Sequence, residues 1–417
     1  SVPFGQGFWG LGGSRLDATR SSIQSLRKGR DVLMPRREPF HVAFSTDSHW
    51  AKAAKICQEQ LPREFPAPPS ERLGFLYVTD HFESQLDSIL TFLRETTATE
   101  NWVGTVGLGI SAAGSTLDGA YECFDAPGVA AMVGGFPPSS FHVFPTVSED
   151  VADFETINKD WLETCASPFG VVHGDPRNPH ITGLLRDVAG KSSAYLTGGL
   201  TSSRGAYDQV ANVVTQGGLS GVLFTPEVQV VTGLAQSCVP IGPIHTITEC
   251  SDEHVVVGID GRPAFEVFAE ELGREMEDEK EEEAVSVLAG IPVAGSDTGD
   301  YLARNLANVD PERGVIVIAE DVFEGDPLLF CRRSRENAET EMARMLESLK
   351  RRLPSTPRGG LYFTCVARGP ALFRESAAEM EAIHGVLGNF PLVGFSANGE
   401  ILNDRLYGYT GVLTLFL

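Results

Sequence analysis

The sequence lacks several features that would assign it to a well-defined class of enzyme or membrane protein. Its seven cysteines are scattered, with no C-x-x-C pair and no zinc-ligand spacing. No apolar run approaches the roughly 20 residues that cross a bilayer. It has neither a G-x-x-x-x-G-K-[ST] loop nor a G-x-G-x-x-G turn between a strand and a helix. We therefore expect no transmembrane segment, no metal and no cofactor.

Positive charge is also scarce. Lysine and arginine total 33 against 56 acidic residues, which gives a formal net charge of -23. A general nucleic-acid-binding protein needs clustered basic residues against the phosphates, so this class is excluded. A chain of 417 residues with 42% hydrophobic residues is long enough for two or three packed soluble domains. The unpaired cysteines favour the cytoplasm or another reducing compartment.

The first 38 residues differ in composition from the rest. They are rich in glycine and aromatic residues and then in serine and arginine, with few acids. A leader of this kind is typical of an organelle transit peptide, which makes a plastid the alternative compartment. A flexible tail and an arm that docks on a protein partner are the other interpretations. For a docking arm, the expected partner-binding residues are Phe4, Phe8, Trp9, Arg36 and Arg37.

Hydrophobic periodicity predicts a mixed α/β fold after this segment. The order strand, loop, helix, strand, glycine turn and later strand occurs three times, beginning near Leu73, Phe169 and Gly360. This order suggests an internal repeat, although any α/β chain can show it. Two apolar runs, 128–136 and 140–144, are separated by Pro137-Pro138, and we expect them to form a hairpin.

The stretch 359–400 carries the best candidates for a binding site. A predicted strand ends before Arg368, and a second strand ends at the turn Asn398-Gly399-Glu400. Ligands bind at strand ends with glycine turns in many α/β layers. Arg368 would grip a carboxylate or phosphate, or pair with Glu400. Glu400 suits a ligand amine and Asn398 a ligand carbonyl. The structural alternatives are a buried ion pair and a self-capped turn.

Three further residues are candidates for ligand binding. Cys365 lies in the strand before Arg368 and faces either the cleft or the core. Gly199 and Ser202 follow another strand and would present an N–H group and a hydroxyl to an anion. No nucleophile, acid–base pair or metal cluster stands out, so we expect no catalytic or metal-binding residues and no enzymatic activity.

These motifs also carry a family resemblance. Cys365-x-x-Arg-Gly, Pro391-Leu-Val-Gly-Phe and Asn398-Gly-Glu-Ile resemble the C-terminal half of FIST (F-box and intracellular signal transduction) proteins. The passage from Pro240 to Ala264 resembles the junction of the two FIST halves. Residues 72–114 and 198–202 resemble the N-terminal half. The resemblance implies an arm at 1–38, an N-terminal FIST domain at 39–260 and a C-terminal one at 261–417, packed around shared mixed sheets.

The resemblance implies a non-enzymatic module that binds a small molecule or a protein partner in sensing and signal transduction. An amino acid is the ligand proposed for the family. The alternative is an interaction or scaffold subunit that docks on a larger protein assembly through the arm at 1–38.

Overall fold

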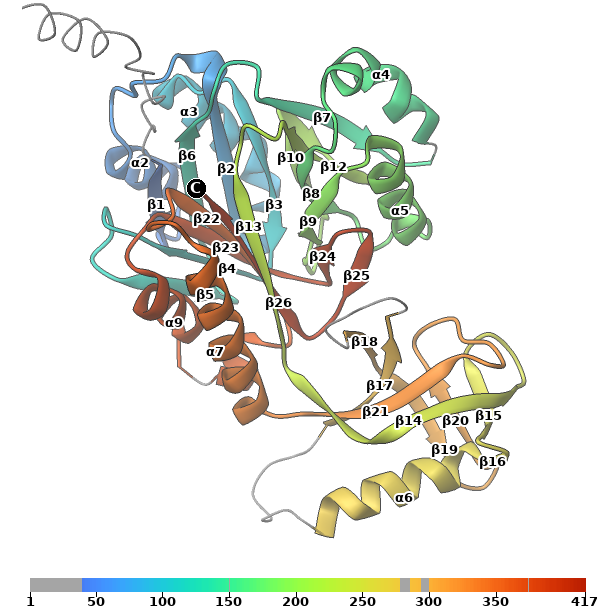
Figure 1. The fold of residues 1–417 in the computed structure, drawn as a ribbon. Helices are drawn as coiled ribbons and strands as arrows, with labels where there is room; N and C mark the ends of the chain where they lie inside the picture. Colours follow the sequence, from blue (N-terminus) through green and yellow to red (C-terminus); the bar gives the residue numbers. More distant parts are fainter. Residues whose placement is uncertain (1–39, 150, 278–285, 294–299, 374) are drawn as a thin grey trace, which may run out of the picture. The chain divides into compact units, whose positions relative to one another are not determined.

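One strand–helix arrangement occurs three times in the computed structural model, which describes residues 40–417 except 150, 278–285, 294–299 and 374 (Figure 1). In each repeat, here called a module, a helix joins two parallel strands, and a later strand returns antiparallel beside the first of them. The mixed α/β fold and the internal repeat expected from the sequence are therefore present.

The modules have the same element order, except that module 3 has one extra short helix, α8 (Gly369–Phe373). Module 1 consists of β1 (His41–Ser45), α2 (Trp50–Gln60), β2 (Arg72–Thr79), α3 (Leu86–Thr97), β3 (Asn101–Gly107) and β6 (Val129–Gly135). Module 2 consists of β7 (Phe141–Val147), α4 (Val151–Thr164), β8 (Phe169–Gly174), α5 (Ile181–Ser192), β9 (Tyr195–Leu200) and β12 (Leu219–Phe224). Module 3 consists of β13 (Val230–Gln236), α7 (Arg335–Arg352), β22 (Gly359–Cys365), α8 (Gly369–Phe373), α9 (Ala378–Leu387), β23 (Leu392–Ala397) and β26 (Thr410–Phe416).

A hairpin from each module pairs with a strand in the sheet of another module. The hairpin of module 1, β4 (Gly109–Ala113) and β5 (Ala120–Phe124), pairs with β23. The hairpin of module 2, β10 (Gln209–Ala211) and β11 (Val213–Thr215), pairs with β3. The hairpin of module 3, β24 (Glu400–Leu402) and β25 (Arg405–Tyr407), pairs with β9. Each module sheet therefore contains a hairpin from another module, and the second and third sheets combine strands from the N- and C-terminal parts of the chain.

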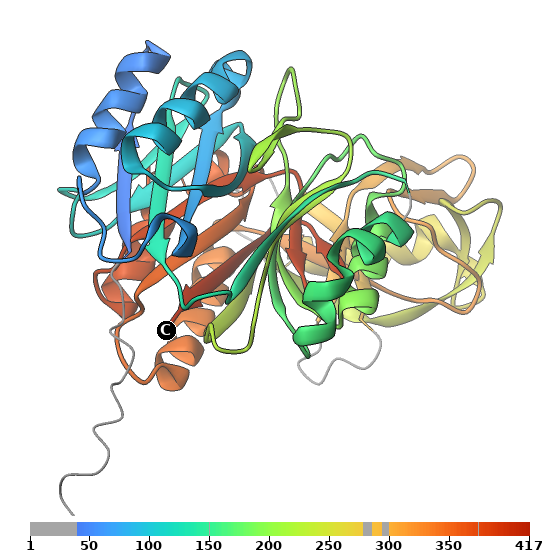
Figure 2. The ribbon, with the colours of Figure 1, turned by 90° about the horizontal axis from the view of Figure 1, so that it is seen from above.

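The helices lie on the outer faces of the sheets (Figure 2). Apolar residues of α2 and α3 pack against the first sheet, those of α4 and α5 against the second, and those of α7 and α9 against the third. The amphipathic spacing in the sequence predicted five of these six helices, because each buries one apolar stripe. It missed α4, which opens the second module.

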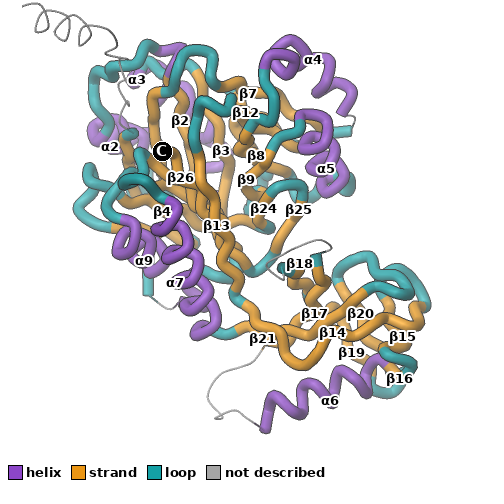
Figure 3. The backbone as a smooth tube through the Cα atoms, in the orientation of Figure 1, coloured by secondary structure: helices purple, strands orange, loops and turns teal. Residues whose placement is uncertain are grey.

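A β-rich insertion separates β13 from α7 (Figure 3). Its strands form one sheet, and α6 (Ala264–Glu277) packs on that sheet through a separate apolar cluster that includes Ile247, Phe268 and Phe330. The domain boundary predicted at 260/261 lies inside this insertion. The strands are β14 (Cys238–Cys250), β15 (Val255–Ile259), β16 (Arg262–Pro263), β17 (Ser286–Pro292), β18 (Tyr301–Arg304), β19 (Leu306–Asp310), β20 (Val315–Ile318) and β21 (Pro327–Arg333).

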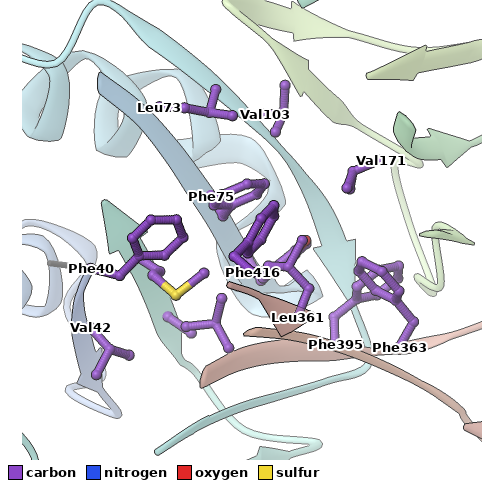
Figure 4. Packing of buried hydrophobic residues seen from close by; sticks show 14 of the residues in the cluster. Phe40, Val42, Leu73, Phe75, Val103, Val171, Leu361, Phe363, Phe395 and Phe416 are labelled. Atoms are coloured by element: carbon purple, nitrogen blue, oxygen red, sulfur yellow. The ribbon is translucent and has the colours of Figure 1, made fainter. Parts of the chain in front are cut away.

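The inner faces of the three module sheets meet in an aromatic core (Figure 4). Tyr77, His173 and Phe363 occupy equivalent positions on β2, β8 and β22. Their ring centroids are 5.6, 6.4 and 6.2 Å apart, so each ring contacts the other two. The equivalent strands of the three modules therefore converge on one point.

A close approach between the two parallel strands of each module requires glycine. Gly104 is paired with Leu76, Gly198 with Val172 and Gly394 with Tyr362. A Cβ atom on these glycines would lie 1.8, 1.8 and 2.0 Å from the carbonyl oxygen of the paired residue. No side chain fits at that distance, so the position is open only to glycine.

Two local predictions are wrong. The runs around Pro137-Pro138 form no hairpin, because β6 pairs with β1 and β2 whereas β7 pairs with β12 in a different sheet. The continuous apolar run at 102–110 also predicts a single strand, but it forms two strands, β3 and β4, which separate at Leu108 and enter different sheets. Both errors concern which sheet a strand enters, which local pattern does not specify.

Candidate functional site

A cleft of about 780 Å³ lies at the carboxyl ends of β22 and β23. Its walls come from module 3, module 2 and the insertion. Module 3 contributes the end of β22, the β23–β24 turn and residues 404–409, module 2 contributes helix α5, and the insertion contributes β18 and the residues after β20. Two of the predicted binding residues, Cys365 and Asn398, line the cleft. Strand ends of this kind are where the fold class usually binds ligands, so the cleft is the candidate site.

Polar contacts join the insertion to the module 3 hairpin across one wall of the cleft. Arg304 forms an ion pair with Glu320 and donates a hydrogen bond to the Leu406 carbonyl oxygen at 3.0 Å. The Tyr409 hydroxyl donates to the Asn305 side-chain oxygen. The shape of the cleft therefore depends on how the insertion is held against the modules.

Glu400 is fully buried beneath this site. It is paired with Gly199 across β24 and β9. Its Oε2 atom accepts hydrogen bonds from the Thr410 N–H at 3.1 Å and the Thr410 hydroxyl at 2.7 Å. Its Oε1 atom has no N–H or O–H donor within the described residues, and the Cys365 thiol acts on the carboxyl as a hydrogen-bond donor. Burial raises the pKa of Glu400 to about 8, against the opposing effect of Thr410, so the carboxyl is largely protonated at neutral pH.

Cys365 lies beside Glu400. Its side chain is 7% exposed and lines the cleft wall. Burial and the adjacent Glu400 raise the pKa of the thiol to about 12. The thiol is therefore protonated, and the nearby Arg368 does not make it a thiolate. Both sequence interpretations hold in part, because the residue is nearly buried and also faces the cleft.

Arg368 lies behind the cleft in a structural ion pair. Its side chain is fully buried, and its Nε and Nη2 atoms donate to Glu379 Oε1 at 3.0 and 2.6 Å. Its Nη1 atom donates to the Ser237 hydroxyl at 2.6 Å. Glu379 also accepts hydrogen bonds from Tyr362 at 2.6 Å and Thr364 at 2.8 Å. The partner of Arg368 is thus Glu379 rather than Glu400, and its guanidinium is not among the groups that line the cleft.

The other predicted residues are distributed differently. Asn398 is exposed in the cleft, and its side chain makes no hydrogen bond to any described residue. Gly199 packs against Ala397, where an added Cβ would lie 2.7 Å from the alanine Cβ. The Ser202 hydroxyl donates to the Ser396 carbonyl oxygen and accepts from the Leu108 N–H, so it ties strands together. Of the predicted binding residues, Cys365 and Asn398 line the cleft, whereas Glu400, Gly199, Arg368 and Ser202 do not.

The basic residues of the cleft were not predicted from the sequence. Arg186 and Thr182 lie one turn apart on α5, and Arg304 and Arg405 come from β18 and the module 3 hairpin. Arg186 is exposed and has no ion-pair or hydrogen-bond partner in the part of the chain that the structure describes. The periodicity of the sequence predicts the polar face of α5. The sequence around α5 does not indicate that this face borders the last hairpin of the chain.

The predicted partner-binding residues lie outside the described residues, so the docking arm stays a prediction. They are Phe4, Phe8, Trp9, Arg36 and Arg37. Within the described residues, no group of three or more histidine, cysteine or acidic side chains is arranged to hold a metal ion. None of the helices in that part of the chain is both long and apolar enough to span a membrane.

The fold and the cleft define a modular mixed α/β protein with a site at its strand ends. Comparison with known families makes this more specific. The FIST N domain matches residues 72–262 and the FIST C domain matches residues 264–403. The chain belongs to the FIST family, whose domains are sensory or signalling modules.

Two similar proteins come from mycobacteria. An uncharacterised protein of Mycobacterium tuberculosis is 28% identical over 383 residues, which cover 88% of this chain and 95% of that protein. An uncharacterised protein of Mycobacterium bovis is 31% identical over 212 residues, which cover 49% of this chain and 54% of that protein. The first similarity extends over the modules and the insertion together.

Proposed function

We propose that this protein is a non-enzymatic FIST module that senses a small polar molecule bound in the cleft. The observation that supports the proposal is the cleft itself, which lies between the ends of the parallel strands β22 and β23 and the insertion. A volume of about 780 Å³ is of the size of small-molecule sites. A ligand there would contact modules 2 and 3 and the insertion at once, so its binding would stabilise one arrangement of the three.

The chemistry of the cleft supports binding rather than catalysis. Its cysteine holds its proton, because the pKa of Cys365 is raised to about 12. Asn398 and Arg186 line the cleft with unbonded polar atoms that suit recognition of a ligand. The amino acid implied by the family resemblance is one ligand class to test.

The second candidate function is an interaction or scaffold subunit that docks on a larger protein assembly through residues 1–38. It depends on the aromatic and basic composition of that segment. The compartment is likewise a proposal: the cytoplasm or another reducing compartment, with a plastid as the alternative.

A thermal-shift screen of the full chain with small polar metabolites tests the sensor function. A ligand that binds the folded state stabilises it by about 2.7 kcal/mol at a concentration of 100 times its Kd, which raises Tm. Asn398→Ala should weaken the response, whereas Asn308→Ala, an exposed residue of β19 outside the cleft, should not. An unchanged Tm with every compound, or an undiminished response in Asn398→Ala, contradicts the proposal.

Deletion of residues 1–38 separates the two functions. The sensor should keep its ligand response without this segment. A scaffold subunit should instead lose its co-purification with a larger complex.

A further inference from the structure

Two side chains in the cleft have hydrogen-bonding capacity that the protein does not use. Arg186 and Asn398 both line the cleft, and neither side chain is bonded to another described residue. A guanidinium offers five donors and no acceptor, and an amide offers two donors and one acceptor. Between them, these side chains present mainly N–H groups to a ligand.

The charged side chains that line the cleft carry a net positive charge, which also favours an anionic ligand. Arg304 is neutralised by Glu320, and Arg405 lies 3.3 Å from Asp404. Arg186 is left as the surplus charge among the cleft-lining residues, in a chain whose net charge is -23. Thr182 lies one turn before Arg186 on α5 and also lines the cleft. A guanidinium beside a hydroxyl is a suitable site for a carboxylate or a phosphate.

Glu400 bears on whether the ligand also carries an ammonium group. Its side chain is fully buried and is not among the groups that line the cleft, and its Oε2 atom already accepts two hydrogen bonds from Thr410. Burial also disfavours the charged carboxylate, so Glu400 presents no negative charge to an amine in the cleft.

We propose that the cleft binds a small organic anion without an amino group, held at its carboxylate or phosphate by Arg186 and at a keto or hydroxyl oxygen by Asn398. This inference rests on the proposed sensor function. The sequence predicted a ligand with an amine, whereas the ligand inferred here has a keto or hydroxyl oxygen that accepts a hydrogen bond.

Isothermal titration calorimetry of the full chain with matched pairs of compounds tests whether the ligand lacks an amino group. Pyruvate is compared with alanine, and 2-oxoglutarate with glutamate, because each pair differs at one position. We expect the oxo acid of a pair to bind about tenfold or more tightly than the amino acid. Glycerol phosphate is the probe that distinguishes a phosphate from a carboxylate.

Variants test the assigned contacts. Arg186→Ala should weaken binding of the anion by about tenfold or more, and Arg186→Lys should restore part of it. Arg351→Ala, an exposed arginine in the last turn of α7 outside the cleft, is the matched control and should bind like the wild type. Glu400→Gln should keep the affinity, because an amide accepts from Thr410 and donates from the other end.

Two results overturn the inference in different ways. Tighter binding of the amino acid, lost in Glu400→Gln, would show that Glu400 holds an ammonium group, and the sensor function would stand. If neither compound class bound and the thermal-shift screen were also negative, the sensor function would fall with the inference.

Discussion

Among single residues, Arg368 gives the clearest test of how much a buried ion pair contributes to stability. It is fully buried and bonded to Glu379 and Ser237. Removing one member of a buried ion pair leaves the other charge without compensation, at a cost of about 3–5 kcal/mol. We therefore expect Arg368→Ala to lower the free energy of unfolding in urea by that amount.

Arg344 provides the matched control. It forms an ion pair with Glu341, but its side chain is 64% exposed. Exposed pairs contribute about 0–1 kcal/mol, so Arg344→Ala should be almost neutral. Equal losses in the two variants would contradict the assignment of Arg368 to a structural ion pair.

Glu400 gives a prediction for pH. Burial raises its pKa from an ordinary 4.5 to about 8 in the folded protein. Between these values the folded state holds a proton that the unfolded state has lost, so stability falls as pH rises from 4.5 to 8. The slope from one such group reaches about 1.4 kcal/mol per pH unit. Glu400→Gln should remove this component and become more stable relative to the wild type as pH rises.

Urea unfolding at pH 5 and pH 8.5 measures the difference between wild type and Glu400→Gln. A difference that is constant with pH would mean that Glu400 is not buried and protonated. The same variant serves the ligand experiment, where a preserved affinity is expected.

Two of the predicted binding residues line the cleft, and their position at strand ends could be predicted from the sequence. Asn398 and Cys365 lie at strand ends, and strand ends are visible as the boundaries of apolar runs. The partner of Arg368 was not visible, because Glu379 reads as one polar residue on an amphipathic helix. Arg186 was missed because its role depends on which hairpin lies beside α5.

At the scale of secondary-structure elements, the glycine between the two parallel strands of each module (the module glycine) gives the same prediction in all three modules. Alanine at Gly104, Gly198 or Gly394 would place its Cβ within 2.0 Å of a carbonyl oxygen in the paired strand. The strands must separate to relieve this contact, which breaks ladder hydrogen bonds and core packing. We expect each variant to lower Tm strongly and to a similar extent.

Gly183 in α5 is the control, because nothing lies within 4 Å of an added Cβ there. Gly183→Ala should stabilise the protein by about 0.5–1 kcal/mol through helix propensity. Differential scanning calorimetry of the four variants checks both expectations. A module glycine that tolerates alanine would show that its two strands are not so closely paired.

The elements themselves were largely predictable, and their pairing was not. Periodicity located β2, β8 and β22 and the helices that follow them, because each buries one face or both. The Pro137-Pro138 connection looked like a hairpin because the two flanking runs are close in sequence. Sheet membership depends on long-range register, which leaves no mark in a local window of the sequence.

At the scale of the whole molecule, the insertion differs from the modules in having its own core. The central aromatic cluster contains no residue of 238–333, and the apolar cluster around Phe268 contains no residue of a module. The ends of the insertion are adjacent, since Cys238 is paired with Arg333 across β14 and β21. A short turn is therefore enough to join them.

We expect a variant in which Asn-Gly replaces residues 239–332 to fold into the three modules and to lose the ligand response. Asn-Gly suits a two-residue turn between antiparallel strands. Removal of Arg304, Asn305 and Glu320 opens one wall of the cleft, although Arg186, Asn398 and Glu400 remain. Circular dichroism and urea unfolding check the fold, and the thermal-shift screen checks the response.

Asn305→Ala is the matched control, because it breaks one contact to Tyr409 and keeps the insertion. It should fold normally and respond more weakly than the wild type. If the shortened chain kept the full ligand response, the site would lie within the modules alone. If it did not fold, the insertion would be needed for the stability of the modules, because module 3 would require β14 and β21 to bring β13 and α7 together.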